Sequence, residues 1–61
     1  MLNIDHSRSY ATEEILVREL NALGVTSGYV IVKNRKNRWT AICSHRVHGV
    51  RMAHEGFMTI N

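Results

Sequence analysis

Positive charge is concentrated in one short stretch near the middle of the chain. Cationic side chains alternate there with asparagines, between two aromatic residues, in the order Tyr29, Lys33, Asn34, Arg35, Lys36, Asn37, Arg38 and Trp39. Cations neutralise phosphates, asparagine amides donate hydrogen bonds to phosphates or bases, and an aromatic ring offers a plane for stacking. A two-stranded β-ribbon also fits the major groove of DNA. The stretch predicts a phosphate-bearing partner, either a nucleic acid or a nucleotide.

The charge is divided unevenly between the two halves of the chain. Residues 1–28 hold two cationic and four acidic side chains, whereas residues 29–61 hold six cationic and one acidic. Such a split favours an anionic partner, which includes an acidic protein surface, or head-to-tail contact between copies. The alternative is that the cations only keep a hairpin tip hydrated. The residues predicted to bind the partner are Lys33, Arg35, Lys36, Arg38, Trp39, Arg46 and Arg51. Trp39 has a second possible role, which is to cap the edge of the core.

A cysteine and three histidines form a second candidate group, in the order Cys43, His45, His48 and His54. Thiolate sulfur and imidazole nitrogen are ligands that zinc prefers. The spacing differs from the CxxC and HxxxH elements of common zinc sites. We therefore expect Cys43 to be a small buried hydrophobe, the histidines to lie on the surface, and no metal or other cofactor to be bound.

The same residues raise the question of catalysis. Cys43 with a nearby histidine, or His54 with Glu55, has the residue types of nucleophilic or acid–base chemistry. Domains with a helix followed by three strands occur among small ribonuclease toxins, but their Gly-Ser-His sequence is replaced here by Cys-Ser-His at residues 43–45. We expect a protein that is not an enzyme.

The size and composition of the chain limit the fold. A chain of 61 residues forms one domain at most, and it buries only about 60% of the surface that its unfolded form exposes. Its single cysteine excludes an internal disulfide and fits a reducing compartment. No apolar run approaches the roughly 20 residues of a membrane span, and the N-terminus is too polar for a secretory signal. We expect a cytoplasmic protein stabilised by association.

One helix is expected over residues 9–24. Ser9 or Thr12 can accept hydrogen bonds from the free amides at its start, and Gly24 is suited to end it. An apolar stripe with helical spacing is formed by Leu16, Leu20 and Leu23.

Three strands are expected after the helix, at residues 29–33, 38–45 and 50–60, because β-branched and aromatic residues are frequent there. Asparagine tolerates left-handed backbone conformations, so residues 34–37 can turn without glycine. A second turn is expected at residues 46–49, and a bulge at Gly56. Residues 1–8 are expected to form an arm or a short edge strand.

These elements predict an α+β domain over residues 1–61, with one N-terminal helix packed on a three-stranded antiparallel meander (α-β-β-β). Ala41 and Cys43 are small and are expected beneath the helix. The other face of the sheet would expose apolar residues such as Val30 and Ile42. An open apolar face on so small a domain is typical of a dimer interface. We therefore expect a homodimer that buries this face or the shoulder of the helix.

Three runs also resemble short uncharacterised accessory proteins of bacteriophages: SYATEE at residues 9–14, RWTAI at 38–42 and HEGFM at 54–58. The resemblance implies an accessory role in the host cytoplasm, such as modulation of a host enzyme or anti-defence activity. It implies no catalytic or binding residue.

The leading interpretation is a small non-enzymatic binding module, a homodimer, that engages an anionic partner (nucleic acid or nucleotide) through a basic β-hairpin. An acidic host protein is a further candidate partner of this hairpin. The alternative is a phage-type protein inhibitor of a host enzyme or defence system, in which Trp39 and exposed apolar residues dominate the contact. A small nuclease or metal-binding protein is the third interpretation.

Overall fold

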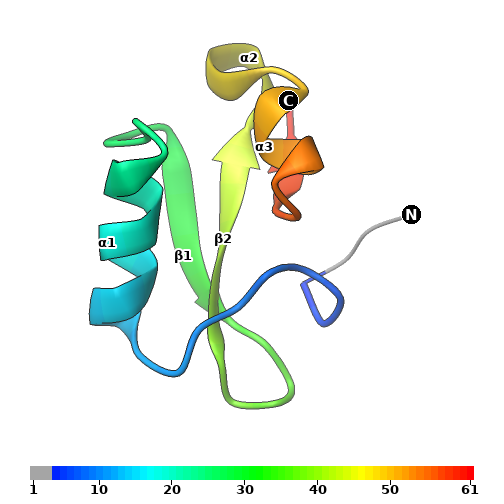
Figure 1. Ribbon diagram of the computed structural model, residues 1–61. Coiled ribbons are helices and arrows are strands. Elements are labelled where there is room, and N and C mark those ends of the chain that lie inside the picture. Colours follow the sequence, from blue (N-terminus) through cyan, green and yellow to red (C-terminus); the bar gives the residue numbers. More distant parts are fainter. Residues whose placement is uncertain (1–3) are drawn as a thin grey trace.

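The computed structural model describes residues 4–61 and shows a helix beside a three-stranded sheet (Figure 1). Its elements are α1 (Glu13–Ala22), β1 (Tyr29–Lys33), β2 (Trp39–Ser44), α2 (His45–His48), α3 (Arg51–His54) and β3 (Met58–Ile60). The strand order is β1-β2-β3, so β2 is central. The predicted α+β class is confirmed, and β1 has the predicted bounds.

The sheet is mixed, so the predicted antiparallel meander is wrong. β1 runs antiparallel to β2, whereas β3 runs parallel to β2. In place of the expected turn at residues 46–49 and the first part of the expected strand at 50–60, the chain forms α2 and α3, which return it to the start of a parallel strand. A parallel pair requires such a crossover, because a tight turn joins only antiparallel strands.

Both ends of α1 are set by local sequence. The side chain of Thr12 accepts a hydrogen bond from the backbone N–H of Ile15 at 3.1 Å, so Thr12, one of the two predicted residues, is the N-cap. At the other end Gly24 has a φ of +82°, and the N–H of Val25 donates to the carbonyl of Leu20 at 2.9 Å. This is a Schellman motif, which buries the residue that follows the glycine.

α3 ends in the same way. Gly56 has a φ of +99°, and the N–H of Phe57 donates to the carbonyl of Met52 at 3.0 Å. Gly56 therefore ends a helix and is not the predicted bulge. Phe57, which follows it, is fully buried, as Val25 is after α1.

A single core lies between the helices and one face of the sheet. Ala41 and Cys43 of β2 are fully buried there beside the leucines of α1, as expected from their small size. The buried apolar residues are Leu16, Leu20, Val25, Ala41, Cys43, Met52 and Phe57.

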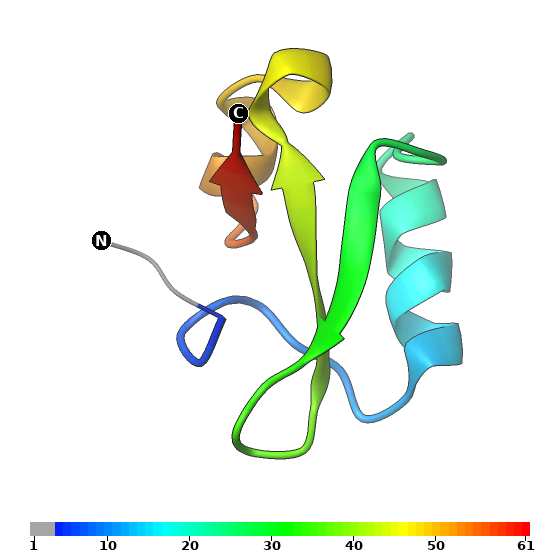
Figure 2. The same ribbon diagram turned by 180° about the vertical axis from the view of Figure 1, so that it is seen from behind.

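An N-terminal arm leads from the described start of the chain to α1 (Figures 1 and 2). Residues 4–8 form no strand, so this part is an arm, and residues 1–3 of the expected element lie outside the described residues. Tyr10 pairs with Trp39 through two backbone hydrogen bonds of 2.8 Å, and the N–H of Arg8 donates to the carbonyl of Gly56 at 2.8 Å. The edge of β2 that faces away from β1 is thus shared by the arm and β3.

Candidate functional site

The loop between β1 and β2 is held in one conformation by Asn34. Its side-chain oxygen accepts hydrogen bonds from the N–H groups of Lys36 at 2.9 Å and Arg38 at 3.1 Å. The N–H of Asn37 donates to the carbonyl of Asn34 at 3.0 Å, and Asn37 has a φ of +64°. The prediction that asparagine would form this turn without glycine is confirmed. Asn34 is only 7% exposed, so the turn is built into the fold.

The cations of this loop are exposed, but they are not equally free. Arg38 is anchored to the arm, because its Nε donates to the hydroxyl of Ser9 at 3.0 Å and its guanidinium donates to the Ser9 carbonyl at 3.1 Å. The ammonium of Lys33 lies 4.9 Å from the centre of the Trp39 ring, in a cation–π contact. We call Lys33, Arg35, Lys36 and Arg38 the basic loop.

A carboxylate of the N-terminal arm, that of Asp5, contacts the basic loop. Asp5 accepts a hydrogen bond from the N–H of Arg35 at 3.0 Å, and its second oxygen lies 3.6 Å from the Arg35 Nε. The side chain of Arg35 is 92% exposed, so water screens this pair strongly. The basic loop together with Asp5 retains an excess of positive charge.

The two remaining predicted cations lie away from the basic loop. Arg46 is on α2, at the end of the sheet opposite the loop (Figure 1). Arg51 donates to the carbonyl of Leu23 just beyond α1, and so contributes to helix packing. The strand β2 alone separates the two ends by about 20 Å, at roughly 3.3 Å per residue. Arg46 and Arg51 therefore do not adjoin the basic loop, and their predicted role in partner binding stays a prediction, separate from that of the loop.

Trp39 is half-buried and packs against the core. Its predicted role at the core edge is confirmed. Since Lys33 covers a face of the ring, Trp39 is not presented as a bare stacking surface.

The structure does not bring the cysteine and the histidines together. Cys43 is fully buried in the core, and burial raises the pKa of its thiol. His45 lies 3.3 Å from the hydroxyl of Thr59, whereas the Nε2 of His48 lies 2.8 Å from the carbonyl of Ser27. His54 is exposed on α3. Within residues 4–61, no group of three or more such side chains is placed to hold a metal ion.

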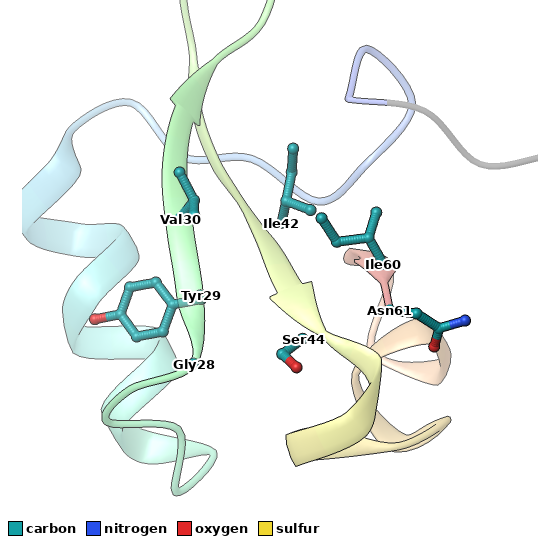
Figure 3. A pocket seen from close by; sticks show the side chains of 7 residues that line it. All are labelled: Gly28, Tyr29, Val30, Ile42, Ser44, Ile60 and Asn61. Atoms are coloured by element: carbon teal, nitrogen blue, oxygen red, sulfur yellow. The ribbon is translucent and has the colours of Figure 1, made fainter.

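The face of the sheet opposite the core carries an open depression. Figure 3 shows the side chains of Val30, Ile42 and Ile60 standing on this face, one from each strand. Val30 is 61% exposed and Ile60 is 52% exposed. The residues that line the depression are Gly28, Tyr29, Val30, Ile42, Ser44, Ile60 and Asn61, none of which is charged.

Sequence reasoning missed Asp5 and Ser9 as parts of the candidate site. Both contact side chains that lie about thirty residues further along the chain, and no local pattern marks such a contact. The available signal was that Asp5 and Ser9 are polar and stand in a segment without apolar periodicity, where side chains are free to contact other surface groups.

The chain matches no protein-family model, and no similar curated protein or solved structure was found. Within the described part of the chain, no helix has the length and apolar character needed to cross a membrane.

Proposed function

We propose that this protein is a small non-enzymatic binding module that engages an anionic partner through the basic loop. The observation that carries the proposal is the rigid turn around Asn34, which holds exposed cations close together at the tip of a hairpin. A fixed arrangement of cations loses less conformational entropy on binding than a flexible one.

The electrostatics of the loop also support this proposal. Clustered charge of one sign raises the local concentration of an oppositely charged partner and its rate of association. Asp5 is the carboxylate that competes for Arg35, and its contact is exposed and weak. An anion of high charge density therefore displaces the Asp5 carboxylate from the Arg35 guanidinium at little cost.

A second copy of the chain is the proposed partner for the open sheet face. The side chains that line the depression are uncharged, so two copies can meet there without repulsion between like-charged side chains. The shoulder of α1 is a poorer interface, because the hollow beside Val17 is also lined by Glu13 and Glu14. Such a homodimer carries two basic loops.

A protein inhibitor of a host enzyme or defence system is the second candidate function. The exposed Val30 and Ile60 favour it, since apolar side chains make contacts that tolerate salt. Trp39 contributes less than expected to such a surface, because it is half-buried beneath Lys33.

Heparin chromatography with matched variants tests the proposed function. The double variant Arg35→Gln/Lys36→Gln removes two loop charges without touching the hydrogen bonds of Asn34 or Arg38. The control Arg18→Gln/Arg46→Gln removes the same charge from exposed positions on α1 and α2. We expect the loop variant to elute at much lower salt than the control, because fewer cations remain to contact the polyanion and release its counterions.

A third variant tests the role of the carboxylate. Asp5→Asn retains an oxygen that can accept from the Arg35 N–H and removes the negative charge. We expect it to elute at higher salt than the unmodified protein. Equal elution of the loop variant and its control would show that the basic loop is not the binding surface.

A further inference from the structure

We infer that the partner of the basic loop is the phosphate backbone of a nucleic-acid duplex, contacted by side chains alone. This inference rests on the proposed function and makes its ligand specific. It follows from two features that a nucleotide site or a single-strand site requires and that this loop lacks.

The first feature that the loop lacks is a set of free backbone amides. The N–H groups of residues 35–38 all donate within the protein, that of Arg35 to Asp5 and the other three to Asn34, at distances from 2.9 to 3.1 Å. Sites that hold the phosphates of a single nucleotide use such amides as donors, in glycine-rich turns or at helix starts. Since these amides are occupied, the loop offers an anion only its side chains.

The second feature that the loop lacks is an exposed aromatic plane. Single strands are bound largely through bases stacked on aromatic rings. The Trp39 ring packs on the core and is covered by the Lys33 ammonium at 4.9 Å. Tyr29 lies at the other end of β1, opposite Cys43, and it packs against the core (Figure 3). Trp39 is engaged within the fold and Tyr29 lies away from the loop, so neither ring is offered to a base at the loop.

The cations themselves fit a duplex better than a flexible strand. Arg38 is fixed by two hydrogen bonds to Ser9, and the Lys33 ammonium is positioned over the Trp39 ring. A duplex presents one phosphate charge per about 1.7 Å of its axis, in rows of fixed geometry. Arg38 and Lys33 are thus already positioned when they meet phosphates of fixed geometry, whereas a single strand must lose conformational freedom on binding.

Fluorescence anisotropy tests this inference with four probes: a labelled DNA duplex of about 20 base pairs, an RNA duplex of the same length, a single DNA strand of that length, and ATP as a competitor. We expect a duplex to bind at least about tenfold more tightly than the single strand at low salt, with a log–log salt slope of about −2 to −4. ATP is expected not to displace it. The duplex that binds more tightly shows whether the preferred phosphate backbone is that of DNA or of RNA.

Trp39 supplies an independent readout, because it is the single tryptophan of the chain. Duplex binding through side chains is expected to leave its fluorescence nearly unchanged, whereas a stacked base quenches it. Lys33→Gln removes a cation of the basic loop, so it should weaken duplex binding several-fold. It also uncovers the Trp39 ring for a stacked base, so it should weaken single-strand binding less. Lys36→Gln is the matched control and should weaken both equally. Circular dichroism of each variant confirms that it is folded.

The outcomes separate the inference from the proposed function. Single-strand binding as tight as duplex binding, with quenching of Trp39, would overturn the inference and leave the basic loop as an anion site. Displacement by ATP would do the same. Equal elution of the variant Arg35→Gln/Lys36→Gln and its control from heparin would overturn the proposed function itself.

Discussion

The hydroxyl of Thr40 donates a hydrogen bond to the backbone carbonyl of Arg8 at 2.6 Å. Thr40 has no exposed surface, although its position in β2 alternates with the buried Ala41 and places it on the face of Ile42. The bond ties the N-terminal arm to the central strand. The same arm supplies Asp5 and Ser9 to the basic loop, so this bond connects the stability of the fold with the geometry of the candidate site.

Replacement of Thr40 tests the strength of this connection. Thr40→Val keeps the shape of the side chain and leaves the Arg8 carbonyl without this donor, so we expect the free energy of unfolding to fall by about 1–3 kcal/mol. Thr26→Val, at an exposed loop position, should change it by less than about 0.5 kcal/mol. Urea denaturation of both variants measures the difference. Equal stability of the two would show that the arm is not held by Thr40.

Alanine at the two helix-ending glycines tests the Schellman motifs. Gly24 has a φ of +82° and open space where a Cβ would lie, whereas Gly56 has a φ of +99° and a Cβ there would touch that of Arg8 at 3.4 Å. Both variants should lose about 1 kcal/mol of stability from backbone strain, and the loss at Gly56 should be similar because 3.4 Å is an ordinary van der Waals distance. Thermal melting compares them. A neutral Gly56→Ala would contradict the assigned end of α3.

Alkaline pH tests the burial of Cys43. Burial raises the pKa of its thiol above the ordinary value of 9.0, and burial is also the largest cause of the raised pKa of Tyr10. The unfolded thiol therefore ionises first, so the stability from this group is complete below pH 9.0 and is lost as the pH rises through the higher folded pKa. Unfolding at a series of pH values should show a decline that is smaller in Cys43→Ala. Identical slopes would mean that Cys43 is accessible to water.

A charge on the open face tests the homodimer. Val30→Lys places like charges opposite one another between two copies, and it replaces a side chain that is 61% exposed in the single chain. We expect it to shift the sedimentation coefficient to that of a monomer of 7.0 kDa. Val47→Lys is the matched control, because Val47 is 64% exposed on α2 and does not line the depression. A monomeric unmodified protein at micromolar concentration would refute the dimer.

Local patterns predicted α1, β1 and the turn around Asn34, because each of these elements is specified by residues close together in sequence. The same patterns failed at α2 and α3, which are about one turn each and too short to show helical periodicity. A usable signal was present. The spacing from Leu20 to Gly24 and Val25 is repeated from Met52 to Gly56 and Phe57, so the second glycine also ends a helix.

The candidate site was predicted only in part for a related reason. The cations of the basic loop are neighbours in sequence, so their proximity could be predicted. The location of Arg46 and Arg51 depends on the path of the chain after β2. A turn and a third antiparallel strand were expected there, whereas the chain forms α2 and α3. The arm contacts of Asp5 and Ser9 arise from tertiary packing alone.

The shared edge of β2 has a consequence for the order of folding. β1 and β2 are joined by a short loop, and a hairpin of this kind forms in about 1–10 μs. The other edge of β2 is completed by Tyr10 and by β3, which come from opposite ends of the sequence and close much larger loops. We therefore expect the hairpin to form before that edge of β2 is paired, which leaves the edge transiently open to strands of other molecules. The chain contains no proline, so no slow prolyl isomerisation prolongs this state.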